Sequence, residues 1–156
     1  MPPDLWNYAL ALYGRRGVEA ACLQLQNEGA DVCLLLCACW LQAHQVAPTQ
    51  DRATALRRVS EPWQHEVIAP LRELRQRWKA QAQHDPQWAG LRGRIKGLEL
   101  EAEQVLLERL AHCASAWPAA QAPAGDWLAL LSPALADGAA LNTLRGAAGS
   151  LQEPED

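Results

Sequence analysis

The feature that most constrains this chain is a run of ten residues without a polar side chain, VCLLLCACWL, which follows directly after Asp31. A helix formed by this run is apolar on nearly every side, so other segments must cover it. A membrane span needs about 20 apolar residues, whereas Gln42 ends this run. Asp31 is a suitable N-cap, because its carboxylate can accept from the free N–H groups of the first turn. The sequence therefore predicts a central core helix over residues 31–45 and no membrane span.

The remaining segments predict an all-α fold, since apolar residues recur at helical spacing and no strand alternation or hairpin signal is present. We expect a compact bundle of about six to eight helices in a single domain over residues 1–145. Around the helix at 31–45, helices are expected at residues 4–14, with Asp4 as the cap, and at 18–27, 62–79, 88–114 and 139–145. Two more are expected at 49–60, capped by Thr49, and at 126–136, capped by Asp126 and split at Ser132-Pro133. Residues 146–156 contain three acids and little apolar area, so we expect an acidic, disordered tail.

Two prolines mark the middle of the chain. Ser60-Glu61-Pro62 predicts the end of one helix and the start of the next, because proline is favoured in a first turn. Pro70 lies inside that next helix, where we expect a kink rather than a break. The helix at 88–114 contains a heptad seam of apolar residues spaced four and three apart: Leu91, Ile95, Leu98, Ala102 and Val105. A neighbouring helix is expected to pair along this seam.

Cysteine usage and the N-terminal residues favour a cytoplasmic location. The count of five cysteines is odd, and three of them lie within the central helix, where their side chains point apart or along the axis. A disulfide scaffold is therefore not expected, and reduced thiols fit the cytoplasm. The first residues, MPPDLWNYAL, show no basic region followed by a long apolar stretch, so neither a secretory signal nor an anchor is expected.

The charges are distributed unevenly. Residues 50–98 contain ten Arg or Lys against five acids, and residues 99–156 contain two Arg against nine acids. Arg72, Arg75 and Lys79 fall on one side of the expected helix, so this basic middle face is a candidate surface for an acidic protein partner. The alternative is an ordinary solvated helix face. Nucleic acid is disfavoured, because no exposed aromatic residues are interleaved with these cations and the pI is about 5.5.

Arg15 and Arg16 form a second candidate binding site. They precede the helix at 18–27, whose free N–H groups and two neighbouring guanidinium groups would together attract a phosphate or carboxylate. The alternative is a solvated loop.

The candidate metal ligands are Cys33, Cys37 and His44, which lie on one face of the central helix at i, i+4 and i+11. A thiolate pair at this spacing can share a zinc ion, but a fourth ligand would have to come from another helix. The alternative is that the cysteines are small core residues. No zinc-protease pattern, phosphate-binding glycine loop or nucleophile–base motif is present. We therefore expect no cofactor and no enzymatic activity.

Several stretches resemble a known family. LWNYALALYGRRGVEAACLQLQNEGADVCLLLCACWL, with WQHEVIAPLRELRQRWK and ALNTL further on, resembles a family of small bacterial proteins defined as a domain of unknown function. The likeness covers most of the chain but implies no activity. In the family pattern the position of Cys33 is commonly Asn, which argues against a required thiol there.

These observations lead to two functional hypotheses. The first is a non-enzymatic protein-interaction domain, an adaptor or regulator, that uses the basic middle face. The alternative is a small-ligand or metal-binding helical protein that uses the face of Cys33, Cys37 and His44. The sequence predicts no oligomeric state.

Overall fold

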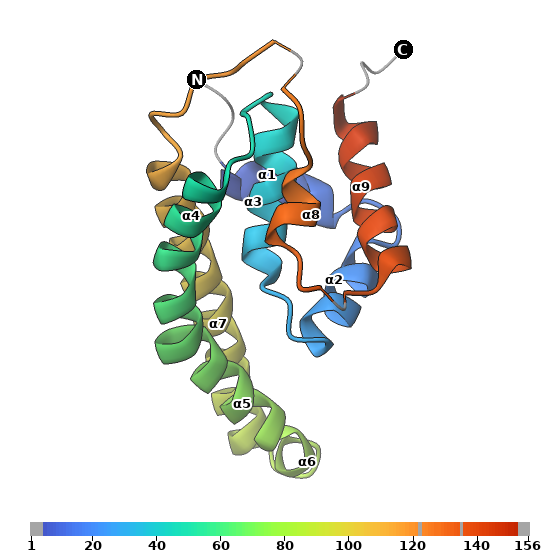
Figure 1. Ribbon diagram of the computed structural model, residues 1–156. Helices are drawn as coiled ribbons and strands as arrows, with labels where there is room; N and C mark the ends of the chain where they lie inside the picture. Colours follow the sequence, from blue (N-terminus) through green and yellow to red (C-terminus); the bar gives the residue numbers. More distant parts are fainter. Residues whose placement is uncertain (1–4, 122, 135, 153–156) are drawn as a thin grey trace.

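The computed structural model describes residues 5–121, 123–134 and 136–152, and these residues are mainly helical (Figure 1). The helices are α1 (Leu5–Tyr13), α2 (Val18–Asn27), α3 (Val32–Ala43), α4 (Gln50–Trp63), the π-helical segment η1 (Gln64–Ile68), α5 (Ala69–Arg77), α6 (Lys79–Ala82), α7 (Pro86–Cys113), α8 (Trp127–Leu131) and α9 (Gly138–Gln152). The described residues contain no sheet, only an isolated antiparallel bridge between Val46 and Ala119. The all-α prediction is therefore confirmed. Within these residues, no helix has both the length and the apolar character needed to cross a bilayer.

Helix α3 lies at the centre of the bundle, as the apolar run predicts. Every residue from Cys33 to Leu41 is buried, and α1, α7, α8 and α9 all pack against this helix. The N-cap is also the predicted one, because an oxygen of Asp31 accepts from the backbone N–H of Leu34 at 3.1 Å. The central helix thus buries its apolar side chains on all sides.

Helices α5 and α6 and the first half of α7 extend beyond the other helices (Figure 1). We call this part, residues 69–98, the arm. In it, α5 and α6 pack against α7, but neither contains a buried residue. The arm is therefore a helical hairpin that lies outside the central core.

The chain runs from α4 into α5 without the break that the sequence predicts at Ser60-Glu61-Pro62. Helix α4 continues through Pro62 because the carbonyl that loses its partner belongs to exposed Arg58, next to solvent. Just before Pro70 the helix takes the wider π-helical form in η1, where the N–H of Ala69 donates to the carbonyl of Gln64, five residues earlier. Pro70 then stands in the first turn of α5, where no N–H is needed. The predicted kink corresponds to this π-helical turn.

The predicted heptad seam of α7 is wrong in its first half. Leu91 and Leu98 are 52% and 47% exposed, while Glu99 is only 5% exposed. The face of α7 toward α5 is therefore polar here, because α5 supplies arginines that neutralise Glu99. Further along, the apolar packing resumes at the buried residues Ala102, Leu106, Leu107 and Leu110.

The last helix is longer than predicted. The sequence pattern predicts that it ends at Arg145 and that a disordered tail begins at 146, but α9 continues to Gln152. The added turns form because Ala147, Ala148 and Leu151 pack, partly buried, against the core. The rest of the predicted tail, 153–156, and the predicted cap Asp4 lie outside the described residues.

Candidate functional site

A buried ion-pair cluster joins the arm to the rest of the protein. The carboxylate of Glu99 accepts from Arg75 twice, from Nε at 2.5 Å and from Nη2 at 3.2 Å, and from Arg72 Nε at 3.2 Å. The side chains of Arg72 and Arg75 are only about one fifth exposed. Two of the predicted binding residues are thus already paired inside the protein, and they are not free surface cations.

The cluster continues from Arg72 toward the ends of α2 and α3. Its guanidinium lies 3.6 Å from Glu103, and the amide oxygen of Gln26, in the orientation that satisfies both amide atoms, accepts from it as well. Burial raises the pKa of Glu103, and the nearby charge of Glu99 raises it further, against the lowering effect of the two arginines. Glu103 is therefore the carboxylate of the cluster that is least well compensated.

Asp31 lies beside this cluster and has several partners. Ser60 Oγ donates to one of its carboxylate oxygens, and Gln64 Nε2 donates to the other at 3.0 Å. Burial raises the pKa of Asp31, although these hydrogen bonds act in the opposite direction. The N-cap of the central helix is thereby tied to α4 and η1.

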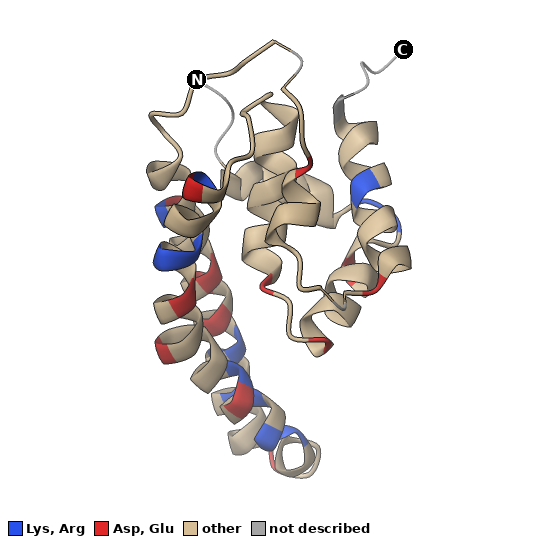
Figure 2. Cartoon of the chain, in the orientation of Figure 1, with Lys and Arg blue, Asp and Glu red and all other residues tan. Residues whose placement is uncertain are grey.

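The remaining cations of the arm are exposed. Between residues 72 and 96 the chain has seven Arg or Lys but only two acids, Glu73 and Asp85. In the part of the chain that the structure describes, no ion pair involves the exposed residues Arg77, Lys79, Arg94 and Lys96. Figure 2 shows these positive charges gathered on the arm, away from α8 and α9. The predicted face is therefore divided: Lys79 is exposed, while Arg72 and Arg75 turn toward α7.

Arg15 and Arg16 are exposed in the connection between α1 and α2. Gly17 follows them with a φ of 83°, a left-handed conformation that glycine adopts readily, and no side chain caps α2 there. The anion site at this turn remains a prediction.

The three predicted metal ligands do not form one site. Cys33 and Cys37 are buried in α3, whereas His44 is the C-cap residue and lies beside Trp40, with the ring centroids 5.2 Å apart. Cys37 and His44 are about 10 Å apart along the axis, since a helix rises 1.5 Å per residue. No group of three or more His, Cys, Asp or Glu among the described residues is placed to hold a metal ion. Burial also raises the pKa values of the Cys33 and Cys37 thiols, which disfavours thiolates.

A cavity of about 200 Å³ adjoins the ion-pair cluster. Its polar wall is formed by Gln26, Gln64, Arg72 and Glu103. The other walls are apolar and come from α1, α3 and α7; they include Trp6, Tyr13, Cys33, Leu36 and Leu107. The cavity opens to solvent at exposed residues of α1 and α7, including Leu10 and Leu100.

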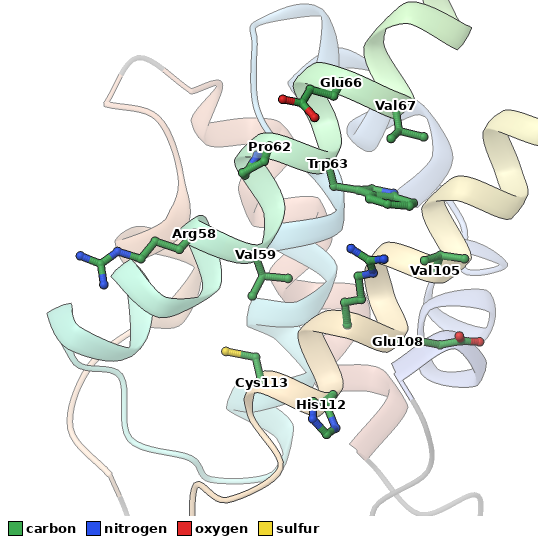
Figure 3. A pocket seen from close by; sticks show the side chains of 11 residues that line it. Arg58, Val59, Pro62, Trp63, Glu66, Val67, Val105, Glu108, His112 and Cys113 are labelled. Carbon is green, nitrogen blue, oxygen red and sulfur yellow. The ribbon is translucent and has the colours of Figure 1, made fainter.

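A wider groove of about 1030 Å³ lies between α4, η1 and α7 (Figure 3). Its apolar lining includes Val59, Trp63, Val67 and Val105, and the charged residues around it have both signs: Arg58, Glu66, Glu108 and Arg109. The guanidinium carbon of Arg109 lies over the ring of Trp63, 4.1 Å from the ring centroid. The indole N–H of Trp63 donates to the carbonyl of Ala102 at 2.9 Å. Because both signs of charge line this groove, it does not favour a ligand of one charge.

Four residues of this site are not predicted from the sequence: Gln26, Gln64, Glu99 and Glu103. The available signal was the spacing of the charges: Arg72 and Arg75 are three residues apart, and Glu99 and Glu103 are four apart, so each pair occupies one helix face. Recognising the cluster requires knowing that these two faces meet, which the spacing alone does not show.

Comparison with known protein families gives a match. Residues 4–110 match the model of a family described as "Protein of unknown function (DUF2390)". No curated protein and no solved structure matches the chain. The matched range contains the arm, the ion-pair cluster and every residue that lines the cavity, but neither α8 nor α9.

Proposed function

This chain belongs to the DUF2390 family, whose description states no activity, and we propose from its geometry that it is a non-enzymatic protein-interaction domain, an adaptor or regulator. Its arm binds an acidic segment of a partner protein. The binding residues are the exposed cations of the arm, Arg77, Lys79, Arg94 and Lys96.

The observation that carries this proposal is the charge of the arm. Seven cations and two acids occupy residues 72–96, in a protein whose net charge is −4. A cluster of one sign on a protruding hairpin attracts the opposite charge and accelerates encounter with it. Because the four exposed cations have no partner among the described residues, a partner's carboxylates can approach them without breaking an existing ion pair.

An acidic protein fits the arm better than nucleic acid does. Single-stranded nucleic acid is held by aromatic side chains on which bases stack. The tryptophans of the arm, Trp78 and Trp88, are instead half-buried and pack edge-to-face against each other, with their ring centroids 6.1 Å apart. The groove in Figure 3 is less suited to an acidic segment, because Glu66 and Glu108 also line it.

In this proposal Arg72 and Arg75 do not bind the partner, although the sequence suggests that they do. They hold α5 against Glu99 and so position the arm. Lys79 remains in the proposed binding surface.

The test compares two sets of charge reversals that change the net charge equally. The arm variant combines Lys79→Glu, Arg94→Glu and Lys96→Glu; the control combines Arg15→Glu, Arg16→Glu and Arg58→Glu, which are also exposed. Each tagged protein is used to isolate partners from cells of the source organism. We expect the arm variant to lose the main partner and the control to keep it. That interaction should also weaken as salt rises, since exposed charges are screened. Loss with both variants, with neither, or with the control alone contradicts the proposal.

We further propose that the protein acts in the bacterial cytoplasm. The support is that all five cysteines are free, as expected where thiols are kept reduced.

A further inference from the structure

The cavity beside the ion-pair cluster contains a carboxylate with few partners. Among the residues that the structure describes, the one ion pair of Glu103 is with Arg72, at 3.6 Å, and no hydrogen bond to its carboxylate is present; its side chain is 31% exposed. An ionised carboxylate has two oxygens that can accept about four hydrogen bonds. The unused acceptor capacity of Glu103 lies on the wall of the cavity.

The charges around the cavity are also out of balance. Three carboxylates, Asp31, Glu99 and Glu103, lie near two guanidinium groups, Arg72 and Arg75. Glu99 accepts hydrogen bonds from both arginines, and Asp31 accepts from Ser60 and Gln64. Glu103 is therefore the carboxylate that lacks a full positive partner. Burial raises the pKa of Glu103, as expected for a carboxylate without adequate compensation. A ligand that brings one positive charge would restore the balance.

The other walls suit an organic cation with an apolar body. Trp6 and Tyr13 both line the cavity, and aromatic rings attract ammonium groups through their faces. Glu103 lines the same cavity as these two aromatic residues. Leu36 and Leu107 supply apolar surface. A cavity of roughly 150 Å³ holds benzene, so about 200 Å³ accommodates one ring with a short chain.

We propose that this cavity is a binding site for a small organic amine, whose ammonium group donates to Glu103 while its apolar body contacts Trp6, Leu36 and Leu107. A carboxylic acid in the same place would be repelled by the carboxylate of Glu103, and a neutral ligand would bring no positive charge to it. This site is separate from the arm cations, so it does not depend on the proposed partner binding.

Isothermal titration of the whole protein with three probes of similar shape tests the proposal. The probes are phenethylamine, phenethyl alcohol and hydrocinnamate, which differ in the charge of the head group. We expect the amine to bind at least about tenfold more tightly than the other two, because a hydrogen bond to a charged group is stronger than one between neutral groups. Equal affinities, tighter binding of hydrocinnamate, or no binding of the amine overturns the proposal.

Two variants locate the binding. Glu103→Gln should weaken amine binding about tenfold or more and leave the alcohol unchanged, because only the charged contact is lost. Glu101→Gln is the matched control, since Glu101 is exposed on the same helix and does not line the cavity. An unchanged amine affinity in Glu103→Gln contradicts the proposal. If that variant does not fold, NMR of the wild-type protein decides: the amine must shift the indole resonance of Trp6, and shifts elsewhere alone overturn the site.

Discussion

Arg75 Nε donates to Glu99 Oε2 at 2.5 Å, and this contact joins α5 to α7 where Glu99 is only 5% exposed. The carbonyl of Arg75 in turn accepts from Arg92 Nε on α7 at 2.9 Å. Because α5 itself buries no residue completely, these polar contacts contribute much of what positions the arm. Charge pairing thus performs in this region the task that apolar packing performs around α3.

The first prediction is that Glu99→Gln destabilises the protein by about 2–4 kcal/mol, because Arg75 loses its ion pair and Arg72 keeps only the longer contact with Glu103. Urea titration measures the loss. Glu101→Gln, an exposed position on the same helix, should change the free energy of unfolding by less than about 0.5 kcal/mol. Equal effects of the two substitutions would show that the buried pairing contributes nothing specific.

The second prediction concerns the central helix. Leu36 is 6% exposed, so Leu36→Ala should cost about 2–5 kcal/mol through lost apolar burial and an enlarged cavity. Leu23 on α2, which is 56% exposed, provides the control, and Leu23→Ala should cost less than about 0.5 kcal/mol. A loss under about 0.5 kcal/mol for Leu36→Ala in urea titration would contradict the central position of α3.

The third prediction is that a short exposure of the native protein to iodoacetamide at about pH 8 labels Cys113 before the other cysteines, because alkylation needs an accessible thiolate. Cys113 is half-buried, whereas Cys22, Cys33, Cys37 and Cys39 are buried. Burial raises the pKa of Cys22 to about 11 and that of Cys39 to about 12, so their thiolates are scarce at this pH.

Peptide mapping by mass spectrometry identifies the labelled cysteine. The variant Cys113→Ser should show almost no rapid labelling, while unfolding in urea should expose the four remaining thiols. Rapid labelling of Cys33 or Cys37 would instead indicate a reactive thiol in the core.

The fourth prediction concerns pH. Burial raises the pKa of Asp31 above 3.8 in the folded state, so folding favours its protonated form. The stability contributed by this group is present below about pH 3.8 and is lost as the pH rises through the folded-state pKa. Asp31→Asn removes the titration and retains a side chain that can cap α3.

The difference in the free energy of unfolding, variant minus wild type, should therefore increase between about pH 3 and pH 6. Urea titrations of both proteins at several pH values measure it. A difference that decreases over this range would mean that Ser60, Gln64 and the helix N-terminus outweigh burial and lower the pKa of Asp31.

Much of the helical pattern follows from the sequence. The N-caps Asp31, Thr49 and Asp126 each accept from a backbone N–H two or three residues further on, as predicted. The end of α8 at Ser132-Pro133 is also as predicted. Such features depend on contacts within one turn of helix, so they are readable from neighbouring residues.

The sequence by itself determined the all-helical fold and the central position of α3, because ten consecutive apolar residues can only be buried by a surrounding coat of helices. Only the tertiary structure decided that Glu99 is buried between Arg72 and Arg75, that Glu103 lines a cavity, and that α9 extends beyond Arg145. The physical reason is that helical periodicity specifies which residues share a face. Which two faces meet depends instead on the register and rotation of packed helices, and these are set by contacts between residues far apart in the chain.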